Sequence, residues 1–416
     1  MKASVVTLGC KVNEYESQSI LSQLKSAGYE ITEGLVFADV YVVNTCAVTN
    51  TAERKSRQVL SKLEKLNKDA KIVVCGCAAQ NNSTQFLTNP NVIALTGNAG
   101  KEEILKFIER ENKTLPEIDH KCYKNMVRPI ETRTRQFIKI QDGCDFFCSY
   151  CLIPYVRGRS RSRDLDDIIA EIKETNANEI VLTGINMSDY KINGELALKT
   201  LAKEIDKLGK RFRISSIECL ALDNEMLDIL ANSKNFCPHF HLSLQSACNG
   251  TLKRMNRHYT IEEFKEIVRK IKEKFASPHI ATDIIVGFKG ETDEEFEDTV
   301  KNLKEIKFSS MHIFPYSERS GTVASKMGGA VDKCTVKQRE KVLQVLNTEF
   351  KTEFLQQNLN KTHKVLIEEF NGEYSLGYTE NYIYTYIQGK HKVGEIVDVK
   401  LTEIYKNGMK GEIINE

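Results

Sequence analysis

The chain has 416 residues, and its 59 Lys or Arg nearly balance its 57 Asp or Glu, so the net charge of +2 points to no class of partner. This length is enough for two or three domains. No stretch approaches the roughly 20 consecutive apolar residues of a membrane-spanning helix, and the first residues lack the apolar core of a signal peptide. We therefore expect a cytoplasmic protein without a membrane partner.

Twelve cysteines are many for a protein of a reducing compartment, where structural disulfides are disfavoured. Metal or cluster ligation is the leading interpretation for some of them. Free cysteine is also a common small core residue, which is the simpler explanation for the others.

Residues 1–120 alternate short β-branched runs with polar segments of helical period, which predicts a parallel sheet with helices on both faces. The runs cover residues 4–8, 39–45 and 71–77, and the helical segments cover residues 14–27 and 50–65. Each run leads to a cysteine: Cys10, Cys46 and Cys77. Carboxyl ends of parallel strands meet at one edge of a sheet, where sites assemble. From this pattern alone, the three cysteines are either ligands of one cluster or buried structural residues.

Residues 130–355 repeat the strand–helix alternation about six times. Capping boxes mark two of the helix starts, at Thr260 with Glu263 and at Thr292 with Glu295. Six successive units predict a partial (β/α)6 barrel with its active site at the carboxyl ends of the strands. The expected strands cover residues 137–141, 179–183, 212–217, 240–244, 281–286 and 309–314.

Residues 356–416 follow a helix expected over residues 336–357. From Lys364 onward apolar and polar residues alternate with a period of 2, and glycines interrupt the run. This pattern predicts a small antiparallel β-barrel or sandwich of the size of OB-like RNA-binding barrels. A module for stability or dimerisation fits the same pattern.

Cys144, Cys148 and Cys151 form a Cys-x3-Cys-x2-Cys triplet just after the first expected barrel strand. Three soft thiolates suit a [4Fe-4S] cluster and leave one iron open, as a catalytic site requires. A structural zinc site is the competing interpretation, but it prefers four ligands in two pairs. Three unrelated core cysteines are the remaining alternative.

The triplet together with the half-barrel resembles the radical S-adenosylmethionine (SAM) superfamily. In that superfamily the open iron binds SAM, whose cleavage supplies a radical. The resemblance implies that Cys144, Cys148 and Cys151 are the catalytic cluster ligands. It also implies that four residues contact SAM: Tyr150 before the last cysteine, Thr183 and Gly184 in an LTG motif, and Gln245.

The three N-terminal cysteine segments, LGCKxN, NTCxVT and GCxAQ, are similar to those of the methylthiotransferase family. The similarity continues through YCLIPYVRGRSRSR, RISSIE, HFHLSLQS, LKRMNRHYT, TDIIVGFKGET and HIFPYSERSGT. It implies that Cys10, Cys46 and Cys77 hold a second [4Fe-4S] cluster, that the C-terminal barrel is a TRAM domain, and that Cys75 is a core residue.

The resemblance further implies a reaction that replaces C–H with C–S–CH3, using two SAM and two clusters. The segments TLGCKVNEYES and VNTCAVTNTAERKSRQ look most like members that modify N6-threonylcarbamoyladenosine at tRNA position 37, giving a methylthio group on C2. Implied partners are the tRNA anticodon stem-loop and an electron donor such as flavodoxin or ferredoxin. Alternatives are an isopentenyladenosine or ribosomal-protein substrate, or a non-catalytic iron–sulfur RNA-binding protein.

An RNA substrate should leave a basic surface. Residues 121–163 hold ten Lys or Arg against three Asp or Glu. We expect Arg157, Arg159, Arg161 and Arg163 to contact RNA phosphates, although such a run is often only a solvated surface. The segment 355–416 has seven Lys, no Arg and nine Asp or Glu, which is unusual for an RNA-binding barrel.

Overall fold

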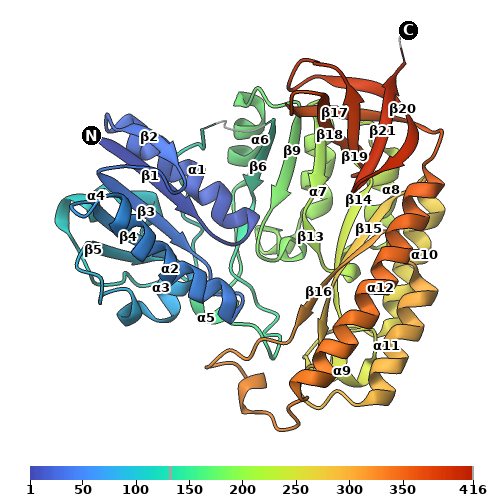
Figure 1. Ribbon diagram of the computed structural model, residues 1–416, viewed down its shortest axis with the longest axis horizontal. Coiled ribbons are helices and arrows are strands. Elements are labelled where there is room, and N and C mark those ends of the chain that lie inside the picture. Colours follow the sequence, from blue (N-terminus) through green and yellow to red (C-terminus); the bar gives the residue numbers. More distant parts are fainter. Residues whose placement is uncertain (131–133, 415–416) are drawn as a thin grey trace.

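The computed structural model describes residues 1–130 and 134–414, which fold into three units in chain order (Figure 1). An N-terminal parallel sheet lies beside a curved central sheet, and a C-terminal barrel lies at the amino ends of the central strands. No helix in the described residues is long and apolar enough to cross a membrane.

The N-terminal unit is a five-stranded parallel sheet of order β2-β1-β3-β4-β5. Its central strands are buried on both faces, so alternate residues of β3 enter two separate cores. The three strands expected from sequence are confirmed within two residues. The sequence pattern did not predict β2, which is a short polar edge strand, or β5. The elements are β1 (Lys2–Thr7), α1 (Lys11–Ser26), β2 (Glu30–Glu33), β3 (Val40–Thr45), α2 (Asn50–Leu66), β4 (Lys71–Gly76), α3 (Cys77–Asn81), β5 (Val92–Gly97) and α4 (Ile104–Arg110).

The central unit is an open half-barrel whose strands follow one another in chain order and pair in parallel. One expected strand, 212–217, is divided at Ser215 into two pieces. The first piece pairs with β9 and the second with β14, so the bend lets the sheet curve. The strands are β6 (Arg135–Lys139), β9 (Glu179–Thr183), β12 (Arg211–Ile214), β13 (Ser216–Ile217), β14 (His239–Gln245), β15 (His279–Val286) and β16 (Ser310–Pro315).

Helices cover the convex face of the half-barrel and bury one continuous apolar core against it (Figure 1). Both capping boxes predicted from sequence are present, at the starts of α10 and α11. The helices are α5 (Ile153–Val156), α6 (Leu165–Glu174), α7 (Leu198–Asp206), α8 (Asn224–Asn232), α9 (Asn249–Arg254), α10 (Ile261–Lys274), α11 (Asp293–Ile306) and α12 (Lys333–Gln357).

The C-terminal unit is a closed five-stranded barrel of order β17-β18-β19-β21-β20, as the period-2 pattern predicts. Closure leaves no unpaired sheet edge. Arg213 of β12 fastens this barrel to the central unit, because its guanidinium donates to the carbonyls of Thr379 and Glu380 at 2.7 Å each. The strands are β17 (Thr362–Phe370), β18 (Tyr374–Thr379), β19 (Tyr384–Gln388), β20 (Ile396–Tyr405) and β21 (Gly408–Ile413).

A buried carboxylate joins the N-terminal unit to the central unit. Glu16 of α1 is 1% exposed and lies 2.5 Å from the ammonium of Lys101, 2.7 Å from that of Lys139 and 2.8 Å from the guanidinium of Arg157. Asp142 completes the group, at 2.7 Å from Lys139 and 3.0 Å from Arg157. Burial alone would raise the pKa of Glu16, but the three cations hold that pKa well below its usual range.

Replacing Glu16 with Gln should leave three buried cations with only Asp142 to offset them. We expect Glu16→Gln to lower the free energy of unfolding by about 3–5 kcal/mol, the usual cost of breaking a buried ion pair from one side. Urea denaturation followed by circular dichroism measures this loss. The control is Glu30→Gln, which removes an exposed pair with Lys2 and should change stability by less than about 0.5 kcal/mol. Equal effects of the two substitutions would contradict the role of Glu16.

Candidate active site

Cys10, Cys46 and Cys77 lie at the carboxyl ends of neighbouring strands, as expected. Cys10 is the N-cap of α1, Cys46 follows β3, and Cys77 is the first residue of α3. Burial raises the pKa of the Cys10 thiol. The loops are tightly packed, since a Cβ on Gly9 would lie 2.7 Å from the Cys46 sulfur. Gly9 has φ +103°, which this approach requires.

Side-chain amides tie these loops together. Asn13 Nδ2 donates to the carbonyls of Leu8 at 2.7 Å and Thr45 at 3.0 Å, which links the first and second cysteine loops. Asn98 Nδ2 lies 3.4 Å from the Cys77 sulfur and donates to the carbonyl of Val156 at 2.8 Å. The second contact reaches the segment just after the cysteine triplet, so the two cysteine sets are held in a fixed relation.

The triplet lies in a loop whose two ends pair as short antiparallel strands, β7 (Gln141–Asp142) and β8 (Arg161–Ser162). Gly143 begins the loop at φ +75°, and a Cβ there would lie 2.0 Å from the carbonyl oxygen of Arg159. Only glycine fits this position. Backbone contacts within the protein therefore determine the shape of this loop.

Each sulfur of the triplet accepts a hydrogen bond. The backbone N–H of Phe146 donates to Cys144 at 3.5 Å, and that of Ile153 donates to Cys151 at 3.4 Å. The third donor is Arg257, whose Nη1 lies 3.3 Å from the Cys148 sulfur. Arg257 is buried and is itself held by Glu218 and by the carbonyl of Ser243. Donors aimed at sulfur stabilise thiolates and tune iron–sulfur clusters.

All twelve cysteines are free thiols, and no three His, Cys, Asp or Glu in the described residues are close enough to hold a single metal ion. A [4Fe-4S] cluster makes a different demand, because each thiolate binds a different iron. Burial raises the pKa of Cys46 and of Cys151 to about 12 and that of Cys144 to about 11, so ligation must displace protons. The hydrogen bonds to sulfur make the triplet a fitting cluster site.

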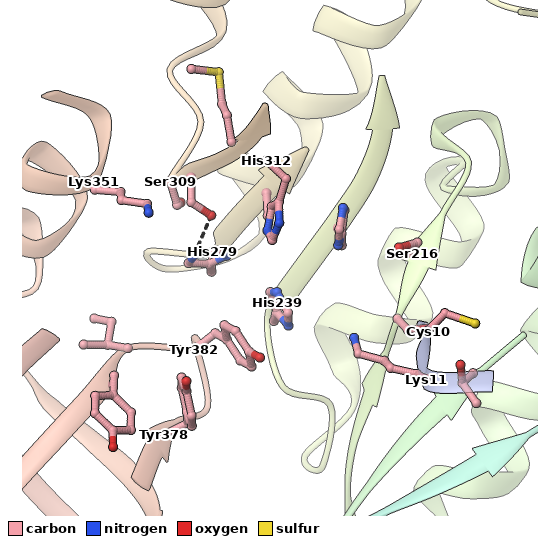
Figure 2. A pocket seen from close by; sticks show the side chains of 18 of the residues that line it. Cys10, Lys11, Ser216, His239, His279, Ser309, His312, Lys351, Tyr378 and Tyr382 are labelled. Atoms are coloured by element: carbon pink, nitrogen blue, oxygen red, sulfur yellow. Dashed lines mark hydrogen bonds between the residues drawn. The ribbon is translucent and has the colours of Figure 1, made fainter. Parts of the chain in front are cut away.

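One large cavity, of about 880 Å³, opens between the three units (Figure 2). Gly9, Cys10 and Lys11 line it from the N-terminal unit. The inner faces of β9, β14, β15 and β16 line it from the half-barrel, and Tyr378 and Tyr382 line it from the C-terminal barrel. Its size is that of a pocket for a nucleoside-sized ligand. Cys10 faces this cavity, and Ile153, two residues after Cys151, also lines it.

The cavity wall carries several basic and imidazole side chains and, in the part of the chain that the structure describes, no carboxylate. Its charged lining residues are Lys11 and Lys351. Four of the chain's eight histidines also line it: His239, His241, His279 and His312. Burial and the nearby cations lower the pKa of His279 to about 3 and lower that of His239 and His312, so these rings are neutral at pH 7. Burial lowers the pKa of Lys11 to about 8.

Of the four residues expected to contact SAM, two line the cavity and two do not. Thr183 and Gly184 line the cavity at the carboxyl end of β9. Tyr150 packs against Phe288 in a small core beside the triplet loop. Gln245 ends β14 with φ +69°, a conformation that non-glycine residues seldom adopt and that occurs at functional sites. Neither Tyr150 nor Gln245 is among the residues that line the cavity.

The expectation of four phosphate-binding arginines needs correction. Arg157 and Arg163 are 1% and 2% exposed, and they bind Glu16 and Glu171 instead of facing solvent. The side chain of Arg161 is largely buried and donates to the carbonyl of Arg157. Arg159 is the exposed member of the run, over the ring of Phe147. Residues 131–133 of the basic segment lie outside the described residues.

The tyrosines of the C-terminal barrel do not form one exposed row. Tyr382 precedes β19 at φ +65°, and its ring stacks on His239 at 4.0 Å between centroids with an interplanar angle of 7°. Tyr378 stacks on Tyr382 at 4.6 Å. Tyr386 is buried. The rings of His239 and Tyr378 therefore both stack on Tyr382, so this residue is part of the contact between the C-terminal barrel and the half-barrel.

Four residues that shape the site were not predicted from the sequence. Asn13 and Arg257 lie within LGCKxN and LKRMNRHYT, which were quoted only as similar segments. Lys11 lies beside Cys10, so its position next to an expected cluster ligand was a signal in the sequence. Glu218 ends RISSIE, and only the fold shows that it meets Arg257.

Two solved structures share the fold at low sequence identity. The radical SAM methyltransferase TsrM from Kitasatospora setae aligns with a TM-score of 0.56 at 15% identity, covering 76% of this chain and 75% of that one. The cobalamin-dependent radical SAM enzyme OxsB aligns with a TM-score of 0.54 at 13% identity, covering 85% and 56%. These matches confirm the fold alone.

Three family models match the three units in order. The Radical SAM superfamily model matches residues 138–303, the model called Uncharacterized protein family UPF0004 matches residues 2–97, and the TRAM domain model matches residues 356–414. The C-terminal barrel is thus a TRAM domain, as expected from the order of the segments.

Relatives of known name match along nearly the whole chain. "Threonylcarbamoyladenosine tRNA methylthiotransferase MtaB" of Bacillus subtilis (strain 168) is 38% identical, covering 95% of this chain and 92% of the relative. The protein of the same name from Aquifex aeolicus (strain VF5) is 37% identical, covering 96% and 100%. A "tRNA-2-methylthio-N(6)-dimethylallyladenosine synthase" of Natranaerobius thermophilus is 32% identical, covering 100% and 97%. The chain therefore belongs to the radical SAM tRNA methylthiotransferases, in the MtaB-type subfamily, which use [4Fe-4S] clusters and SAM.

Proposed function

We propose that this enzyme adds a methylthio group to C2 of N6-threonylcarbamoyladenosine at tRNA position 37. The observation that carries the proposal is the single cavity that reaches from Cys10 to the inner face of the half-barrel. A reaction that needs a sulfur source and a radical at one carbon requires both to face one substrate. The names of the MtaB relatives support the threonylcarbamoyl substrate.

In this proposal Cys144, Cys148 and Cys151 hold the cluster that binds SAM, and Cys10, Cys46 and Cys77 hold the cluster that carries sulfur. When bound, the two clusters and two SAM supply the radical, the sulfur and the methyl group. Thr183 and Gly184 position SAM from the cavity side, with Tyr150 and Gln245 near the triplet loop.

The cavity must also exclude water from the reacting carbon. Its wall includes histidine and tyrosine rings that stack on one another. A rigid wall of this kind orients a nucleoside without moving itself. It leaves the chemistry to groups at the two cysteine loops.

We further propose that the RNA is the tRNA anticodon stem-loop and that Arg159, at the exposed edge of the triplet loop, contacts its phosphates. In this proposal the acidic TRAM domain contributes to RNA binding through its shape more than through its charge. An electron donor such as flavodoxin or ferredoxin would reduce the cluster of the triplet.

Substitutions in the two cysteine sets should have different effects on iron content and on SAM cleavage. We expect Cys144→Ala to abolish reductive cleavage of SAM to 5′-deoxyadenosine, because it removes a ligand of the SAM-binding cluster. Cys46→Ala should halve the iron, from about eight to about four atoms per chain, while SAM is still cleaved. Iron and sulfide analysis with chromatography of the nucleoside product measures both.

The matched control is Cys75→Ala. Cys75 is buried two residues before Cys77, in the core on the other face of the sheet. This variant should keep about eight irons. Wild-type iron in Cys46→Ala, or loss of half the iron in Cys75→Ala, would refute the second cluster site.

Deletion of the gene should remove 2-methylthio-N6-threonylcarbamoyladenosine from cellular tRNA and leave the unmethylthiolated nucleoside in its place. Mass spectrometry of digested tRNA measures the change, and the wild-type gene restores it while the Cys144→Ala gene does not. An unchanged level of this nucleoside would refute the proposed substrate. Loss of the isopentenyl counterpart instead would assign the enzyme to the substrate of the dimethylallyladenosine relatives.

A further inference from the structure

Lys11 is a cation that has no partner among the residues that the structure describes. It follows Cys10 at the start of α1, is half-buried, and forms no ion pair within the described part of the chain. Figure 2 shows its side chain extending from the Cys10 loop toward His239 and Tyr382. A partly buried ammonium without a carboxylate is costly unless a bound group offsets its charge.

No carboxylate of the described residues lines the cavity to supply that charge. The carboxylate that acts on Lys11 at longer range is Asp283, whose oxygen lies 3.1 Å from Nε2 of His241. The guanidinium of Arg213, which also acts on Lys11, is held by Glu179 and by two carbonyls of the TRAM domain. Lys11 therefore faces a space that is suited to an anion.

The neighbouring walls offer groups for the rest of such a ligand. Ser215 and Ser216 line the same cavity, and hydroxyls both donate and accept hydrogen bonds. A ligand with a carboxylate, a hydroxyl and a urea would find a partner for each. The threonylcarbamoyl group has these three, whereas an isopentenyl group has none.

We infer that Lys11 binds the threonyl carboxylate of the substrate and is the residue that selects threonylcarbamoyladenosine over apolar N6-modified adenosines. This inference rests on the proposed function and deepens it. A buried polar group that its ligand fails to pair strongly rejects that ligand. Lys11 therefore excludes the isopentenyl nucleoside because binding it would leave the ammonium desolvated and unpaired.

The test uses the reconstituted holoenzyme and two anticodon stem-loop RNAs. One carries N6-threonylcarbamoyladenosine, and the other carries the same nucleoside with its carboxylate converted to a neutral methyl amide. We expect Lys11→Gln to bind the acid RNA about 10- to 100-fold more weakly, as loss of a charge-assisted hydrogen bond implies, and to bind the amide RNA within about twofold of wild type. Lys11→Arg should retain the preference for the acid.

Two lysine variants act as controls. Lys25→Gln removes the same charge from the other end of α1, where Lys25 is exposed, and should leave both affinities unchanged. Lys351→Gln tests the opposite wall of the cavity (Figure 2). If Lys351→Gln, and not Lys11→Gln, removes the preference for the acid, the carboxylate lies at that wall and the inference is wrong.

Other outcomes also overturn it. Equal weakening for both RNAs would mean that Lys11 contacts the RNA backbone, and loss of SAM cleavage without RNA would mean that it binds SAM. Failure of the proposed function is visible separately, because wild-type enzyme would then not methylthiolate the acid RNA. Wild-type turnover of the acid RNA together with an undiminished acid preference in Lys11→Gln would refute the role of Lys11 alone.

Discussion

The structure depends on how Glu16 is buried. A carboxylate on the first helix is neutralised by Lys101 from its own unit and by Lys139 and Arg157 from the half-barrel. Arg157 also donates to Asn13, which holds the first two cysteine loops together. One network of charges therefore sets the position of the N-terminal cysteine loops relative to the triplet loop. Since buried charges tolerate little displacement, this arrangement fixes the distance between the two sets of cysteine loops.

The cavity is the product of all three units. The N-terminal unit brings Cys10 and Lys11, the half-barrel brings its histidines, and the TRAM domain closes the amino end of the strands with the ring of Tyr382. The TRAM domain thus has an architectural task beside any contact with RNA. Its acidic composition is easier to understand in this role, because Arg213 and Arg135 of the half-barrel bind its carbonyls and its Glu368.

Local sequence patterns predicted most of the strands and both capping boxes, because each depends on neighbours in sequence. The triplet of Cys144, Cys148 and Cys151 also stands out as a local spacing, whereas the second cysteine set was implied only by family resemblance, and the ligand roles of both sets stay predictions. The patterns failed where partners are distant in sequence. Arg157 was expected to contact RNA phosphates, yet its partner Glu16 lies 141 residues earlier. Lys11 carried no periodic signal, and only the assembled cavity shows that it forms no ion pair with the described residues.

The ladder between β7 and β8 has a further consequence for the triplet loop. The ladder joins the two ends of the triplet loop through backbone hydrogen bonds. These hydrogen bonds, and not metal–sulfur bonds, therefore offset the entropy cost of closing the loop. A zinc finger, in contrast, unfolds without its metal. The same ladder holds the two ends of the triplet loop together whether or not its sulfurs bind iron.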